Sequence, residues 1–199
     1  AGAVLATAQE ALYSDKDTRG AEYLTRRCLT PATWRRFGLG YKSDCGLPGT
    51  WKAETKERTY PPQPAILMPW YVGRRLVALR YRFLDSHTYT DQGDKEVTNK
   101  QGALFGSEFA GRLFGGQSMA RACEEKRALI ICEGEINAMS IYQVASETKA
   151  DVLSIGGESS HLTPAMAAYA RRFRHVTAWA DRPEVAKGLM DDLPGAYGV

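Results

Sequence analysis

Two acidic residues, Glu133 and Asp181, stand where an α/β protein can use carboxylates for chemistry. Glu133 directly follows the apolar run Leu129–Cys132. Asp181 follows a second apolar stretch, residues 175–180. Open α/β sheets bind their ligands outside the carboxyl ends of the strands. A bare buried charge is very costly, so Glu133 must be solvated, paired or bound to a metal ion. On this stretch alone, an ordinary acidic residue in a strand–helix loop is an equally good interpretation.

The elements that must position this pair are strands alternating with helices in the last third of the chain. The pattern predicts strands at 128–132, 152–155 and 175–180, and helices at 137–146, from 163 to about 173, and from 183 onward. Short helical crossovers between apolar strands imply a parallel sheet. All parallel strands end at one edge, so we expect Glu133, the turn Gly156-Gly157 and Asp181 to lie close together.

The first part of the chain mixes helices with a predicted hairpin. The patterns predict a helix over 1–14, a second helix capped by Asp17 or Thr18 and extending to Cys28, a helix from Thr30-Pro31 to Phe37, and a strand after 39. They then predict a loop over 43–64 and hairpin strands at 65–71 and 75–84. A polar mobile loop over 85–101 and an irregular helix over 108–121 are expected to follow. The expected fold class is therefore α/β, with an α+β amino-terminal subdomain at 1–125 and a parallel β/α domain at 126–199.

Composition excludes several other classes of protein. The chain has 199 residues, of which 44% are hydrophobic and 25% are charged, which is ordinary for a globular protein. No apolar run approaches the roughly 20 residues of a membrane span, and we expect a cytoplasmic protein. The four cysteines form no CxxC pair and only three histidines are present, so we do not expect a zinc site. The chain starts with Ala rather than Met, which is consistent with an excised fragment.

The basic residues are unevenly distributed along the chain. The formal net charge of +3 is too small to imply nucleic acid, but arginines concentrate before residue 85 while the two candidate carboxylates lie in the last third. Arg80 and Arg82 alternate with apolar residues, so they share one strand face and suit phosphate contact. A salt-bridged surface is the alternative for this pair. On this pattern alone, Arg26, Arg27, Arg35 and Arg36 are interpreted as a solvated face.

The last third resembles a Toprim domain, the fold shared by bacterial primases, type IA and type II topoisomerases and some nucleases. The first motif reads IICEGEINAMS, in which Glu133 and Gly134 match and Asn137 stands at the usual Asp position. The second reads VTAWADRPEVAKG, in which Asp181 matches and Pro183 replaces the second Asp. Two of the four carboxylates usual in the family are therefore missing.

The first part narrows the resemblance to bacterial DnaG-type primases. The segment AEYLTRRCLTPATWRRFGLGYKSD is similar to the opening of the primase polymerase core. KEVTN followed by LFG is similar to a later stretch of the same family. The family's zinc-finger and helicase-binding parts have no counterpart in this sequence. The resemblance follows nearly the whole chain in order and implies a DNA primase, a DNA-directed RNA polymerase that makes short primers.

That resemblance also implies roles for individual residues. Glu133 and Asp181 are the expected catalytic residues, with Mg²⁺ or Mn²⁺ as cofactor, because hard ions take oxygen ligands. Glu184 is the first choice to replace the missing carboxylate; Glu135, Asp191 and Asp192 are the alternatives. The residues expected to hold phosphates or template are Arg80, Arg82, Lys95, Asn99, Arg35 and Arg36. The implied partners are single-stranded DNA, NTPs and a replicative helicase.

The missing carboxylates leave two other functions open. A degenerate, non-catalytic Toprim module would bind nucleic acid or a replisome partner without synthesis. A Toprim nuclease is the third candidate, disfavoured by the primase-like first half. Loss of two negative charges near a divalent ion is a large electrostatic change. The sequence therefore predicts where the site lies but not whether it is active.

Overall fold

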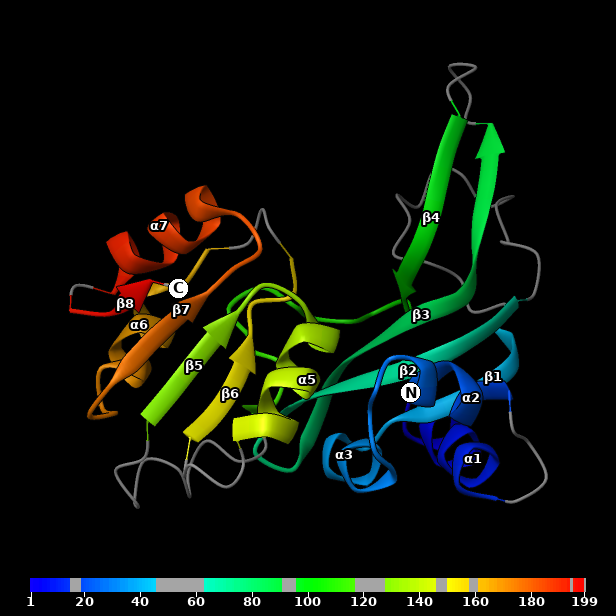
Figure 1. Cartoon of the computed structure of the whole chain (residues 1–199). Coiled ribbons are helices and arrows are strands. Elements are labelled where there is room, and N and C mark those ends of the chain that lie inside the picture. Colours follow the sequence, from blue (N-terminus) through cyan, green and yellow to red (C-terminus); the bar gives the residue numbers. More distant parts are fainter. Residues whose placement is uncertain are drawn as a thin grey trace. The chain divides into compact units, whose positions relative to one another are not determined.

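The computed structural model of the chain describes residues 1–14, 19–45, 63–90, 96–116, 128–145, 150–157, 161–193 and 195–198. The chain divides into two compact units, whose elements are labelled in Figure 1. Unit 1 comprises residues 1–69 and 76–108, and unit 2 comprises residues 70–75 and 109–199. The domain boundary predicted at 125/126 falls within 117–127, outside the described part of the chain.

Unit 1 combines three helices with a four-stranded sheet in the order β1-β2-β3-β4. Its elements are α1 (Gly2–Tyr13), α2 (Arg19–Arg26), α3 (Pro31–Phe37), β1 (Gly40–Cys45), β2 (Gln63–Val72), β3 (Arg75–Thr90) and β4 (Glu96–Ala103). Strand β1 pairs antiparallel with β2, and β3 pairs antiparallel with β4. Helix α1 packs closely on β1, where a Cβ on Gly40 would lie 2.7 Å from the Ala8 side chain. The predicted β2–β3 hairpin is confirmed.

The helix ends of unit 1 follow local sequence signals, with one correction. Helix α3 starts at Pro31 behind the Thr30 cap and stops at Gly38, which has φ 65°. The prediction that α2 reaches Cys28 is wrong, because the helix ends at Arg26. Cys28 takes φ 58°, and the Leu29 N–H donates to the Leu24 carbonyl at 3.0 Å, which closes the helix with a left-handed residue.

The prediction of a mobile loop over 85–101 is also wrong for its described parts, 85–90 and 96–101. Strand β3 continues to Thr90 and pairs with β4, with Arg80 opposite Ala103 and Thr90 opposite Glu96. Main-chain pairing satisfies the backbone groups of a polar segment as well as those of an apolar one. The β-branched residues Thr88, Thr90, Val97 and Thr98 also favour strand over loop.

Unit 2 contains the predicted parallel sheet, in the strand order β6-β5-β7-β8. Its elements are β5 (Ala128–Cys132), α5 (Glu135–Ala145), β6 (Ala150–Ser154), α6 (Pro164–Ala170), β7 (Val176–Trp179), α7 (Pro183–Asp192) and β8 (Tyr197–Gly198). The two-residue strand β8 is too short to leave a sequence pattern. Together the two units confirm the α/β fold class.

The helix predicted over 108–121 is wrong for its described part, 108–116, where no α-helix forms. Gly111 and Gly115 have φ 68° and 85°, a conformation that a right-handed helix cannot contain. The segment instead makes a bridge to the sheet, in which the Phe114 N–H donates to the Ser154 carbonyl at 2.9 Å.

The sheet of unit 2 is covered differently on its two faces. On one face, Leu129, Ile131 and Val176 belong to an apolar cluster with residues of α6 and α7, such as Met166 and Leu189. On the other, α5 packs against β6 and β5. Among the described residues, no helix has the length and apolar character required to cross a membrane.

Candidate active site

The carboxyl ends of β5 and β7 bring Glu133 and Asp181 together. Cys132 pairs with Trp179 in the sheet, so the two chains leave the sheet side by side. The peptide N–H of Asp181 donates to Glu133 Oε1 at 3.1 Å. The expectation that the two acidic residues meet at one sheet edge is therefore confirmed.

Glu133 is held at this edge from two sides. Its side chain has the Asp181 N–H as a donor, which a buried carboxylate requires, since the residue is only 5% exposed. Its main-chain carbonyl accepts the Ser154 hydroxyl at 2.9 Å, and that hydroxyl oxygen accepts the Gly156 N–H at 2.9 Å. The glycine turn after β6 therefore supports the backbone of Glu133.

Asn137 completes a polar group with these two carboxylates. It lies in the first turn of α5, and its Nδ2 donates to Asp181 Oδ2 at 3.4 Å. The amide thus neutralises none of the charge, but it orients the exposed Asp181 side chain. An amide oxygen is also a ligand for hard cations. The resemblance to the first Toprim motif identified Asn137 only as a residue that differs from the usual Asp. The sequence did not predict its contact with Asp181.

Glu135 makes a different contact, although its sequence position is close. Its side chain is 4% exposed, and Oε1 accepts the Trp70 indole N–H at 3.2 Å. The Trp70 ring packs edge-on against Phe109, with centroids 5.0 Å apart. Glu135 therefore joins the hairpin tip to α5 within unit 2, a contact that no sequence motif indicated.

Cys132 directly precedes Glu133 and is buried, and its thiol is unreactive. Burial raises the pKa of its thiol far above the usual value, and the charges of Glu135, Glu133 and Asp181 raise it further. The Sγ contacts the Leu153 carbonyl at 3.5 Å. A thiol that stays protonated is a poor nucleophile and a poor metal ligand.

Glu184, Asp191 and Asp192, which are predicted to replace the missing ligands, all belong to α7. Glu184 is exposed in the first turn of α7. Asp192 Oδ2 accepts the Leu162 N–H at 3.1 Å, and Asp191 is exposed. Within the described ranges, no three His, Cys, Asp or Glu side chains gather closely enough to hold a metal ion.

Two carboxylates and an amide still fit one kind of metal site. Mg²⁺ commonly uses one or two protein carboxylates and completes its octahedron with water and substrate phosphates. Glu133 and Asp181 supply that number of carboxylates at one strand edge. Glu184 as a third ligand remains a prediction.

The predicted phosphate-binding residues lie in unit 1. Arg35 and Arg36 occupy the last turn of α3, and the Arg35 guanidinium lies 5.3 Å from the centroid of the Tyr13 ring. Arg80 and Arg82 are both half-buried on β3, two positions apart and hence on one face. Asn99 belongs to β4, and Lys95 lies outside the described residues. Their roles stay predictions.

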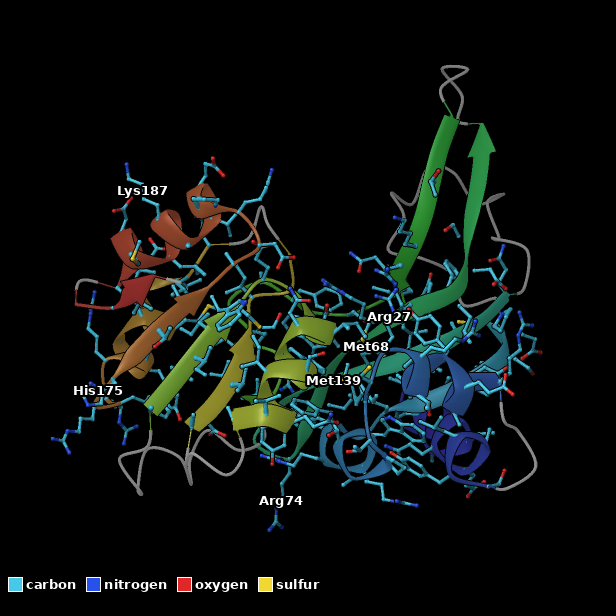
Figure 2. All side chains as sticks on the ribbon, viewed as in Figure 1. Arg27, Met68, Arg74, Met139, His175 and Lys187 are labelled. Carbon is cyan, nitrogen blue, oxygen red and sulfur yellow. The ribbon has the colours of Figure 1, made fainter. Side chains whose placement is uncertain are left out.

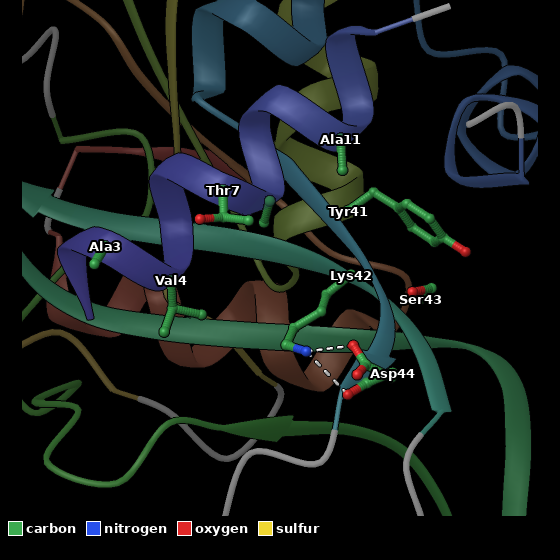
Figure 3. Close-up of a pocket in the computed structure, with 9 residues that line it drawn as sticks. Ala3, Val4, Thr7, Ala11, Tyr41, Lys42, Ser43 and Asp44 are labelled. Carbon is green, nitrogen blue, oxygen red and sulfur yellow. Dashed lines mark hydrogen bonds and ion pairs between the residues drawn. The ribbon is translucent and has the colours of Figure 1, made fainter. Parts of the chain in front are cut away.

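A separate groove in unit 1 contains none of the predicted catalytic residues. Its volume is about 410 Å³, and Ala3, Thr7, Tyr41 and Lys42 are among its lining residues (Figure 3). Lys42 forms an ion pair with Asp44 at the rim. The hydrogen bond from Lys42, together with its charge, lowers the pKa of the Asp44 carboxyl. The wall of α1 is formed by small side chains and offers no group for catalysis.

Comparison with known proteins gives a result only at the level of structure. No protein-family model matches the sequence, and no curated protein matches it. The Aquifex aeolicus primase, comprising zinc binding and RNA polymerase domains, matches with 18% identity and a TM-score of 0.65 over 100% of this chain and 53% of that one. A DNA primase domain from Pseudomonas aeruginosa matches with 16% identity and a TM-score of 0.65, over 96% and 64%.

A third match is the DnaG primase catalytic domain bound to ssDNA, with 16% identity and a TM-score of 0.62 over 94% of this chain and 63% of that one. This chain therefore spans less than two thirds of the length of each of these three structures. At such low identity the likeness concerns the fold and not the activity. The fold of this chain is that of the DnaG-type primase catalytic core.

Proposed function

We propose that this chain is the catalytic core of a DNA primase, with the sheet of unit 2 as its Toprim domain. The proposed activity is synthesis of short RNA primers from NTPs on single-stranded DNA. The observation that carries the proposal is the hydrogen bond between the Asp181 N–H and Glu133, which unites two acidic residues from separate strand ends. The likeness to primase cores supports the same assignment.

The chemistry is nucleotidyl transfer. The primer 3′-hydroxyl oxygen bonds to the α-phosphorus of the incoming NTP, the bond to the β-phosphate oxygen breaks, and pyrophosphate leaves. The hydroxyl proton must leave at the same time. Glu133, buried and already holding one main-chain donor, is the candidate to accept it or to orient the water that does. Asn137 keeps the Asp181 carboxylate in place for the same site.

Glu133 and Asp181 are the residues that would hold Mg²⁺ or Mn²⁺. The ion supplies charge neutralisation at the phosphate and lowers the cost of forming an alkoxide. The neutral Asn137 amide means that fewer carboxylates than usual in the family hold this ion. We therefore expect a weak metal site that depends on substrate phosphates for the rest of its ligands.

Template binding would use the arginines of unit 1 and an aromatic side chain of unit 2. Arginine forks bind phosphates bidentately, and exposed aromatic rings stack with bases in proteins that bind single strands. Trp179 is 42% exposed, two residues before Asp181. One structural relative is a catalytic domain bound to ssDNA. A replicative helicase is the further partner we propose.

A non-catalytic Toprim module is the second candidate, and one observation favours it. The position where the family has an Asp is held by Asn137, whose amide donates to the Asp181 carboxylate that a metal would use. A metal ion must compete with that donor. Such a module would bind single-stranded DNA without making primers.

The decisive experiment is primer synthesis on single-stranded DNA with labelled NTPs, in Mg²⁺ and in Mn²⁺. We expect product from the wild type and at least a ~100-fold loss for Glu133→Gln, which keeps the hydrogen-bond acceptor but removes the charge. Glu10→Gln, an exchange of the same kind in α1, is the matched control and should retain full activity. DNA binding without product from the wild type would establish the non-catalytic module instead.

A further inference from the structure

The turn between α6 and β7 carries a concentration of positive charge that the proposed active site does not use. Residues 161–180 contain three arginines and two histidines but no Asp or Glu. Arg171, Arg172, Arg174 and His175 are consecutive in this turn except for the buried Phe173, and all four are exposed. Figure 2 labels His175 at the start of β7. This is the end of the parallel sheet opposite to Glu133 and Asp181.

A small pocket lies between this turn and the segment that follows α7. Its volume is about 180 Å³, and it is lined by Arg171, Phe173, Arg174, Val176, Leu193, Gly195 and Ala196. The buried side chains of Phe173, Val176 and Leu193 form an apolar floor, whereas the two arginines are exposed at the rim. At about 30 Å³ per water molecule, the pocket has room for a phosphate group with part of its hydration shell.

Main-chain hydrogen bonds hold the walls of the pocket in place. The N–H groups of Arg171 and Phe173 donate to carbonyls of α6 at 3.0 and 3.1 Å, and the His175 carbonyl accepts the Leu129 N–H of β5 at 2.8 Å. On the other wall, the Ala196 N–H donates to the Leu193 carbonyl at 2.9 Å. A pocket built on such contacts needs little ordering when a ligand binds.

The cations around the pocket are only weakly engaged by the protein. Arg171 Nη2 lies 3.4 Å from the Asp192 carbonyl, and the Arg172 guanidinium lies 5.8 Å from the centroid of the Tyr169 ring. The carboxylate of Asp192, the residue whose carbonyl Arg171 contacts, already accepts the Leu162 N–H, and Asp191 is exposed on α7. Cations also stabilise the carboxyl end of a helix. That effect accounts for Arg171 next to α6 but not for Arg174, which lies beyond the last turn.

We propose that this pocket, defined by Arg171 and Arg174, binds a phosphodiester group of a nucleic-acid strand. Guanidinium groups match phosphate oxygens in a fork geometry that lysine lacks. The absence of carboxylates from residues 161–180 leaves the positive charge uncompensated within that stretch. The pocket is a second nucleic-acid contact on unit 2, independent of metal and of the carboxylate pair.

The test is binding of a labelled oligo(dT) strand by fluorescence anisotropy in EDTA, over a range of NaCl concentrations. For Arg171→Gln/Arg174→Gln we expect Kd at 100 mM salt to rise on the order of tenfold. The slope of log K against log salt should fall in magnitude by about 0.7, since one phosphate contact on a single strand contributes about 0.7. Arg174→Lys keeps the charge, so it should retain the slope and lose part of the affinity.

Lys187→Gln is the matched control, because Lys187 is an exposed cation of the same unit on α7 (Figure 2). It should change Kd less than twofold. The proposal would be overturned if the double variant kept the affinity and the salt slope of the wild type. It would also be overturned if poly-glutamate displaced the labelled strand as well as unlabelled oligo(dT) does. Circular dichroism checks folding, with Arg174→Gln alone as the milder variant. Glu133→Gln should leave the salt slope unchanged, so failure of the primase proposal is distinguishable from failure of this one.

Discussion

The main-chain N–H of Asp181 and the side chain of Glu133 meet across 3.1 Å, although 48 positions separate them in sequence. Because the donor is a peptide group, the contact does not consume the Asp181 carboxylate. That carboxylate accepts Asn137 Nδ2 instead. The edge of the sheet therefore contains one buried carboxylate fixed by the backbone and one exposed carboxylate held by a neutral amide.

Asn137→Asp should strengthen metal binding and weaken the metal-free protein. A third carboxylate replaces the donor to Asp181, so like charges repel by about 1 kcal/mol, which lowers Tm by about 2–4 °C in EDTA. Mg²⁺ should reverse the loss at a concentration about tenfold lower than the wild type needs. Thermal unfolding during Mg²⁺ titration measures both effects. Asn137→Ala, which removes the donor without adding charge, should show no such gain. An unchanged Mg²⁺ response in Asn137→Asp would contradict the expected metal position.

Glu184→Gln tests whether this residue is the third metal ligand. With Glu184 as a ligand, the Mg²⁺ concentration for half-maximal primer synthesis should rise about tenfold, because removing one carboxylate weakens the site. Glu10→Gln is the control, since Glu10 is an exposed carboxylate on α1 that is not a predicted ligand. If both variants need the same Mg²⁺ concentration as the wild type, Glu184 does not bind the ion.

Trp70→Phe should destabilise the protein more than Trp34→Phe. The Trp70 indole N–H donates to the buried Glu135 carboxylate, whereas the Trp34 indole donates to the neutral Leu29 carbonyl at 2.9 Å. Hydrogen bonds to charged groups are worth about 1.5–3 kcal/mol, compared with about 0.5–1.5 kcal/mol for neutral ones. Urea unfolding measures the difference. Equal losses of unfolding free energy would show that the hydrogen bond to Glu135 is no stronger than the one to the neutral Leu29 carbonyl.

Cys132 should resist alkylation at pH 8 in the folded protein, whereas the exposed Cys28 should react. The pKa of the Cys132 thiol is raised by burial and by three nearby carboxylates, so it stays protonated. Peptide mapping by mass spectrometry after brief iodoacetamide treatment distinguishes the two sites. Rapid labelling of Cys132 would mean that β5 opens readily.

The same pKa shift predicts the direction of a pH effect on stability. A thiol with a raised folded pKa contributes its full stabilisation below the ordinary value of 9.0. Above that pH the unfolded chain loses its proton first, so the folded state loses stability. Cys132→Ser should show a smaller decline between pH 9 and 10 than the wild type. An identical decline would exclude Cys132 as its source.

The sequence by itself determined the elements whose signals are local. Strand β5 has its predicted bounds because an unbroken apolar run specifies a buried parallel strand. Thr30-Pro31 and Gly38 delimit α3 through capping chemistry. The common edge of parallel strands then predicts that Glu133 lies near Asp181.

Only the tertiary structure decided the contacts between distant segments. The polar β3–β4 ladder depends on main-chain pairing, which leaves little trace in side-chain pattern. The glycines at 111 and 115 allowed a bridge to β6 where composition indicated a helix. Asn137 meets Asp181, and Trp70 meets Glu135, because the folded chain brings together residues 44 and 65 positions apart. No local propensity encodes such pairs, since each forms only after the sheet has placed its two ends.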